Sequence, residues 1–112
     1  MDQKTKGKYG EDLAVSFLQK HGYEILERNY RHRRGEIDII ALEKNLLVFV
    51  EVKLRRDVGY GQPESFVSNA QQRLVIETAE EYIFAINWQK DIRFDIIAIH
   101  GEELEHIKDA FY

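Results

Sequence analysis

Residues 46–54, with the sequence LLVFVEVKL, are the strongest β-strand signal in the chain and constrain its fold most. Apolar and β-branched side chains dominate this run, and they favour a strand. Side chains alternate between the two faces of a strand, so the valines share one face, whereas Glu51 and Lys53 share the other. Because an unpaired buried charge costs free energy, we expect the valine face in the core and the polar end of the other face at a cleft.

The residues before this run predict one helix and two strands. Apolar side chains recur at three- and four-residue spacing over about residues 5–20, and Gly22 follows as a helix cap. Residues 23–30 alternate well enough for a strand. Residues 37–42 form a short apolar strand that Asp38 interrupts.

The residues after the run predict a second helix and two more strands. Ser68 and Gln71 have the spacing of a capping box, and a helical stripe follows them to about Ile86. Residues 92–99 have a strand pattern, and residues 104–107 form its short partner. The order α-β-β-β-α-β-β predicts an α/β fold, with a mixed sheet flanked by helices.

Composition limits the classes of protein to which the chain can belong. Its 112 residues, 44% of them hydrophobic, suit a single domain over residues 1–112. The chain has no cysteine, which excludes disulfides and thiolate metal sites. It also has no apolar run of about 18 residues, the length that spans a membrane. We therefore expect a cytoplasmic protein with no membrane partner.

Charge is distributed unevenly along the chain. The net charge of −4 argues against a phosphate-rich partner. However, residues 1–56 hold twelve Lys and Arg against nine Asp and Glu, whereas residues 57–112 hold four against eleven. The basic residues gather at 28–34 and 53–56. A solvated surface explains these clusters about as well as a nucleic-acid partner does.

Asp38 and Glu51 are the residues whose pattern points to chemistry. If their two strands pair as a hairpin with a short turn, Asp38 lies across from Val50 or Glu51, which brings two carboxylates together. Like charges so close need a cation, and oxygen ligands suit Mg²⁺ or Mn²⁺. Lys53 could then orient the attacking water or stabilise negative charge, as phosphodiester hydrolysis requires.

Structural explanations of the same residues stay open. Glu51 and Lys53 would also suit a surface ion pair on an edge strand. Asp38 could cap a turn or pair with an arginine of residues 28–34. A Glu-x-Lys tripeptide is expected about once in a chain of this composition, so only its setting gives it meaning.

Other polar residues have weaker patterns. We expect Glu36 in the turn before its strand, with its side chain opposite to that of Asp38, as a structural or supporting acid. Asp95 interrupts an apolar strand, where it either faces the cleft or pairs with Arg93 or Arg28. The four histidines show no ligand spacing.

Several motifs together resemble those of a known family. They are GEIDIIA at residues 35–41, VFVEVKLR at 48–55, the G-x-x-G-E spacing at 7–11, RFDI at 93–96, and the terminal residues 106–111. They resemble the signature of the YraN-like family of small bacterial proteins. That family is similar to archaeal Holliday-junction resolvases and to the wider PD-(D/E)xK nuclease superfamily. The resemblance implies a restriction-endonuclease-like fold.

The resemblance also implies roles for individual residues. Glu11, Asp38, Glu51 and Lys53 would be the catalytic residues. Asp38, Glu51 and the carbonyl of Val52 would bind Mg²⁺ or Mn²⁺, and Lys53 would be the catalytic lysine. Glu11 resembles an extra acid that reaches in from the first helix.

The sequence therefore predicts a metal-dependent endonuclease that acts on DNA, branched DNA included, with RNA left open. Contacts to nucleic acid are expected from Arg31, Arg33, Arg34, Arg55 and Gln72, although a solvated helix face also explains Gln72. The alternative is a non-catalytic nucleic-acid-binding or assembly module in DNA processing, which the acidic second half favours. A homodimer and a DNA-processing protein partner are consistent with the resemblance to resolvases.

Overall fold

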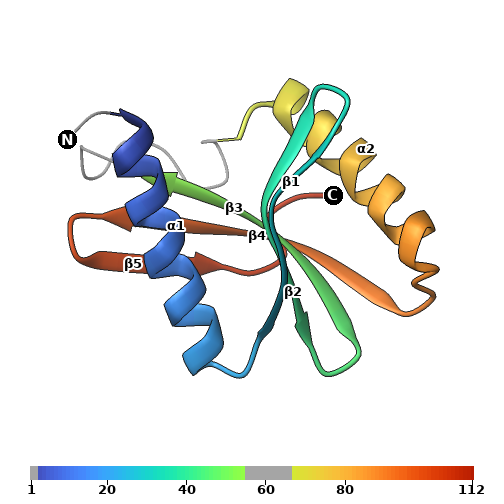
Figure 1. The fold of residues 1–112 in the computed structure, drawn as a ribbon, viewed down its shortest axis with the longest axis horizontal. Helices are drawn as coiled ribbons and strands as arrows, with labels where there is room; N and C mark the ends of the chain where they lie inside the picture. Colours follow the sequence, from blue (N-terminus) through green and yellow to red (C-terminus); the bar gives the residue numbers. More distant parts are fainter. Residues whose placement is uncertain (1–2, 55–66) are drawn as a thin grey trace.

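Five strands form one mixed sheet with a helix on each face, in a computed structural model that describes residues 3–54 and 67–112 (Figure 1). The elements are α1 (Gln3–Lys20), β1 (Glu24–His32), β2 (Gly35–Glu43), β3 (Leu46–Leu54), α2 (Asn69–Ile86), β4 (Asp91–His100) and β5 (Glu103–Ile107). This is the predicted order, and it is consistent with a restriction-endonuclease-like fold. No described helix is long and apolar enough to cross a membrane.

The sheet has the order β1-β2-β3-β4-β5. Strands β1, β2 and β3 form an antiparallel meander, β3 and β4 are parallel, and β5 returns antiparallel to β4. A parallel pair needs a long crossover connection, and α2 lies in it. Strand β3 is therefore central, which makes the explanation of Glu51 and Lys53 as an ion pair on an edge strand wrong.

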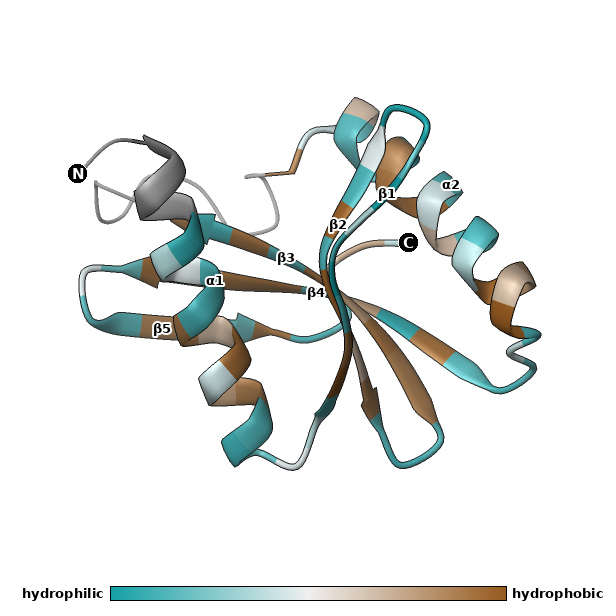
Figure 2. Cartoon of the chain, in the orientation of Figure 1, coloured by the Kyte–Doolittle hydropathy of each residue, from teal (hydrophilic) through white to brown (hydrophobic). Residues whose placement is uncertain are grey.

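Apolar residues cover both faces of the sheet. One core, beneath α2, includes Ile37, Ile40, Phe49, Val75, Ala79, Phe94 and Ile96. The other, beneath α1, includes Ala14, Leu18, Ile39, Val48, Val50 and Ile97. Figure 2 shows the hydrophobic residues along the middle of the strands and hydrophilic residues at their connections. The face of β3 that carries Glu51 is thus fully packed up to that residue, which is only 3% exposed.

The hairpin of β1 and β2 is longer than predicted. Arg31 pairs with Glu36 and His32 with Gly35, so part of the basic stretch belongs to the strands. Packing explains why residue 35 is a glycine: a Cβ at this position would lie 1.9 Å from Oγ1 of Thr78 on α2. Only glycine allows this close approach, because it has no Cβ, and the end of the hairpin therefore packs directly against α2.

Asp95 is a buried acid with a purely structural set of partners. It is 0% exposed, and Nε and Nη2 of Arg93 each donate to it at 2.8 Å. His106 Nε2 lies 2.7 Å from it, and the Asp109 N–H donates to it at 3.0 Å. The predicted pairing with Arg93 is confirmed. The cluster ties β4 to β5 and to the residues that follow β5.

Candidate active site

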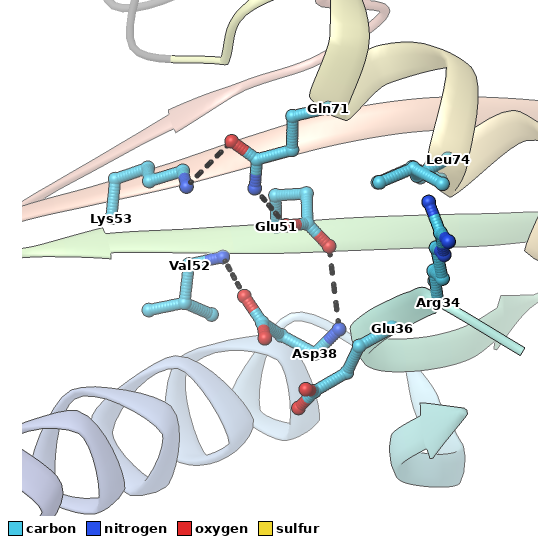
Figure 3. A pocket seen from close by; sticks show the side chains of 10 residues that line it. Arg34, Glu36, Asp38, Glu51, Val52, Lys53, Gln71 and Leu74 are labelled. Atoms are coloured by element: carbon cyan, nitrogen blue, oxygen red, sulfur yellow. Dashed lines mark hydrogen bonds between the residues drawn. The ribbon is translucent and has the colours of Figure 1, made fainter. Parts of the chain in front are cut away.

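Asp38 and Glu51 meet at the point where the paired register of β2 and β3 ends. The register places Ile39 opposite Val50, and its continuation places Asp38 opposite Glu51, in agreement with the predicted hairpin. The Asp38 N–H donates to Oε1 of Glu51 at 3.4 Å, and the Val52 N–H donates to Oδ2 of Asp38 at 2.8 Å (Figure 3). Side chains thus replace the backbone ladder here, and they bring two carboxylates together.

An irregularity in the hairpin turns Asp38 toward this position. Ile37 and Ile39 are two residues apart, yet they lie in different cores on opposite faces of the sheet. The normal alternation of a strand therefore breaks at Asp38. Asn29, which lies between the partners of Ile37 and Ile39 on β1, has a left-handed backbone with φ of 54°. The pairing of β1 with β2 keeps its register at this point, so a local distortion of the backbone, rather than an inserted residue, accompanies the break.

The two carboxylates are short of positive charge. Burial raises the pKa of Asp38 to about 6; a backbone hydrogen bond opposes this rise, and the charges of Glu11 and Glu36 add to it. Burial, followed by the charge of Asp38, raises the pKa of Glu51 to about 8, although Lys53 opposes this. A cation bound between the two carboxylates would favour their ionised forms.

Gln71 connects the acids to Lys53. Nζ of Lys53 donates to Oε1 of Gln71 at 3.3 Å, and Nε2 of Gln71 donates to Oε2 of Glu51 at 3.2 Å (Figure 3). Sequence reasoning missed this role because the capping box accounted for Gln71. The cap is present, since Oγ of Ser68 accepts from the Gln71 N–H at 3.1 Å, but the glutamine side chain turns into the site.

These residues surround a pocket of about 320 Å³. Its lining combines charged or amide side chains with a glycine and apolar residues: Arg34, Gly35, Glu36, Asp38, Glu51, Val52, Lys53, Gln71, Leu74 and Val75. Glu36 corrects a prediction. It lies within β2 rather than in a turn, and it lines the pocket together with Asp38.

Glu11 approaches the acids from α1. Its Oε1 accepts from Nδ2 of Asn29 at 3.0 Å and lies 3.6 Å from Nη2 of Arg28. Its side chain is 16% exposed, and its charge helps to raise the pKa of Asp38. Glu11 does not line the pocket, and its role as a catalytic acid stays a prediction.

The arginines predicted to bind nucleic acid lie in different surroundings. Arg34 lines the pocket, whereas Arg33 is exposed at the tip of the hairpin. Arg31 is 75% exposed, and its Nε lies 3.3 Å from Oε2 of Glu36. Arg55 lies outside the described residues.

Gln72 does not line the pocket. Its Nε2 donates to the carbonyl of Val67 at 3.0 Å, which keeps the amide at the start of α2. A contact between Gln72 and nucleic acid stays a prediction.

The donor set of the site fits a hard divalent cation in part. Within the described ranges, no group of three or more His, Cys, Asp or Glu side chains is arranged to hold a metal ion. Asp38 and Glu51 would therefore supply two oxygens, and a backbone carbonyl and water the others. Mg²⁺ accepts such a site, because it commonly keeps several waters and binds one or two carboxylates. The Val52 carbonyl as the further ligand stays a prediction.

Comparisons with known proteins give a family match and a distant structural likeness. Residues 10–99 match the family described as "Uncharacterised protein family UPF0102". The chain is 48% identical to a UPF0102 protein of Flavobacterium psychrophilum over 110 residues, which cover 95% of this chain and 92% of that protein. It is also 48% identical to a UPF0102 protein of Cytophaga hutchinsonii over 111 residues, which cover 98% of each.

Among solved structures, the chain is similar to SfsA of Pyrococcus furiosus in complex with Ca²⁺. The identity is 13% and the TM-score is 0.34. The match covers 96% of this chain but only 64% of that one.

Proposed function

The chain belongs to the uncharacterised protein family UPF0102, and from its site we propose that it is a metal-dependent endonuclease that cuts DNA by phosphodiester hydrolysis. One observation carries the proposal: two neighbouring acids with raised pKa values share a pocket with a lysine that Gln71 links to one of them. Acids without enough compensating charge cost stability, and such groups concentrate at functional sites.

Each residue has a role in this proposal. Asp38 and Glu51, with the carbonyl of Val52, hold Mg²⁺ or Mn²⁺. When bound, the cation supplies Lewis-acid stabilisation of the charge that develops on the phosphate. Lys53 places a positive charge beside the phosphate oxygens and orients the attacking water. Glu11 adds a negative charge near Asp38, which strengthens the electrostatic attraction of the site for a cation.

The DNA backbone binds at the end of the hairpin formed by β1 and β2, where basic residues gather. Arg33 and Arg31 are exposed there, and phosphate contacts of this kind position a strand without reading its sequence. Arg55 and Gln72 are proposed for the same contacts. We place the activity in the cytoplasm, because the cysteine-free chain has no need of an oxidising compartment. A homodimer would supply two such sites for a symmetric junction.

The test is a cutting assay on linear, flapped and four-way DNA with Mg²⁺ or Mn²⁺. We expect metal-dependent cutting that Asp38→Asn and Lys53→Ala each reduce at least about a hundredfold, the low end of general acid–base and electrostatic contributions. The exposed residues Asp91 and Lys108 provide the matched controls Asp91→Asn and Lys108→Ala. If folded protein cuts none of the DNAs, or if Asp38→Asn still cuts, the proposal is wrong.

A second candidate keeps the fold without the chemistry: a nucleic-acid-binding or assembly module in DNA processing. One observation favours it: the described part of the chain has no group of three or more His, Cys, Asp or Glu side chains that could hold a metal ion. Calorimetric titration with Mn²⁺ separates the two candidates. Binding in the millimolar range or tighter that Asp38→Asn abolishes supports the enzyme, and its absence supports the module.

A further inference from the structure

We infer that one end of the pocket binds the base of an unpaired nucleotide against Arg34 and Leu74. The substrate class would then be DNA with unpaired nucleotides rather than intact duplex. This inference rests on the nucleic-acid-binding part of the proposed function.

The depth of the acids gives the first reason. Glu51 is 3% exposed, and the pocket around it holds about 320 Å³. This volume is at the lower limit of small-ligand sites, so it suits one nucleotide. In an intact duplex the bases are stacked inside and the strands are held together. A pocket can therefore receive a base only from a single strand or from a nucleotide taken out of the stack.

The arrangement of the pocket gives the second reason. Figure 3 shows Lys53 at one end, the acids in the middle, and Arg34 with Leu74 at the other end. Lys53 and the acids with their cation would be sufficient to bind a phosphate, so the end with Arg34 and Leu74 is left without a role. A planar guanidinium and an apolar side chain together suit the face of a base, because proteins bind unpaired bases by stacking them on flat or apolar groups.

Leu74 itself gives the third reason. It is half-buried and lines a charged pocket, and neither apolar core includes it within the described residues. Its backbone is held in place, since its carbonyl accepts from Oγ1 of Thr78 at 2.7 Å and lies close to Gly35. The leucine therefore presents apolar surface that a phosphate alone would not use.

Arg34 gives the fourth reason. No described carboxylate forms an ion pair with it, whereas Arg31 is paired with Glu36 and Arg28 with Asp12. Its guanidinium is thus available to a ligand at the end of the pocket next to Leu74 (Figure 3).

The experiment measures binding by fluorescence anisotropy with Ca²⁺, on three labelled DNAs of one sequence: a blunt duplex, the same duplex with a bulge of unpaired nucleotides, and the single strand. The variants are Arg34→Lys, Leu74→Ala and Leu74→Phe. Arg34→Lys keeps the positive charge but removes the planar guanidinium, and Leu74→Phe keeps a surface on which a base can stack. Arg73→Lys, an exposed residue next to Leu74, is the matched control. Circular dichroism checks that each variant is folded.

We expect the bulged and single-stranded DNA to bind at least about tenfold more tightly than the blunt duplex, the effect of about one stacked base. Arg34→Lys and Leu74→Ala should erase this preference, while Leu74→Phe and Arg73→Lys should keep it. Equal binding of all three DNAs would overturn the inference. So would Arg34→Lys with the wild-type preference, because Arg34 would then act as a phosphate contact.

The proposed endonuclease and this inference fail in different ways. Suppose that the wild type cuts blunt and bulged DNA equally fast with Mg²⁺ and that Asp38→Asn cuts neither. The endonuclease then stands and the inference falls. If the protein cuts nothing yet prefers bulged DNA through Arg34 and Leu74, the inference stands and the endonuclease falls.

Discussion

The backbone N–H of Asp38 lies 3.4 Å from Oε1 of Glu51, across the end of the ladder that pairs β2 with β3. A strand pair normally satisfies its backbone groups with each other, but here carboxylates accept from both strands. The fold thereby holds two acids side by side in the interior, where burial raises the pKa of both and the charge of Asp38 raises that of Glu51 further. This arrangement is costly without a cation.

Stability without metal should depend on the protonation of Glu51. Its pKa is raised in the fold from 4.5 to about 8, so the fold favours the protonated form. This contribution is fully present below the unfolded pKa and is lost as the pH rises through about 8. At pH 8 in EDTA, Glu51→Gln should raise the melting temperature by about 4 °C or more. A variant that melts with the same pH dependence as the wild type would contradict this.

Metal affinity should increase with pH over the same range. A cation must displace the protons of Asp38 and Glu51, whose pKa values are about 6 and about 8. Calorimetry with Mn²⁺ should show an affinity about tenfold higher, or more, at pH 8 than at pH 6, with release of protons. In Glu51→Gln the affinity of any remaining Mn²⁺ binding should no longer change with pH above pH 7. Equal affinities at both pH values in the wild type would refute the prediction.

Gln71 should affect cutting more than stability. It bridges Lys53 and Glu51, and groups that orient metal ligands typically contribute about 10- to 100-fold. We expect Gln71→Ala to slow DNA cutting by that factor and to weaken Mn²⁺ binding, with a nearly unchanged urea midpoint. The exposed Gln89 provides the control Gln89→Ala. Loss of stability without loss of metal binding would indicate that the Gln71 side chain has only a structural role, since Gln71→Ala keeps the backbone N–H that Ser68 caps.

Asp95 should matter for stability alone. Burial by itself raises its pKa, but hydrogen bonds from His106 and Arg93 outweigh this, and its pKa lies below 3.8. Its stabilising contribution is therefore present above the unfolded pKa and is lost as the pH falls through the lower folded value. Asp95→Asn should cost about 3–5 kcal/mol, because it leaves Arg93 without its charged partner. Urea denaturation at pH 7 measures this, with the exposed Asp91→Asn expected within about 0.5 kcal/mol of the wild type.

The helices and strands could be predicted because their signals are local. Alternation identified β3 and β4 to within about one residue, and the Ser68 cap marked the start of α2. The hairpin register followed from a short turn, so the meeting of Asp38 with Glu51 was predictable as well. The ends of β1 and β2 were not, because pairing extends through polar residues that carry no strand pattern.

Two side chains of the pocket required the tertiary structure. Glu36 was expected in a turn and facing away from Asp38, because the polar residues at the tip of the hairpin carry no strand pattern, but pairing with Arg31 places it within β2. Gln71 has two roles, of which only its backbone contact to Ser68 is encoded nearby. Its side-chain partners lie 18 and 20 residues away on β3.

The amino-acid sequence alone determined the order of the elements, the acids that interrupt apolar strands and the lysine beside them. These follow from periodicity and from the cost of burying charge, which act over a few residues. Only the tertiary structure decided which groups share the pocket. The approach of α2 to Gly35 and the break in β2 at Asp38 bring distant residues together, and such packing has no counterpart in a local pattern.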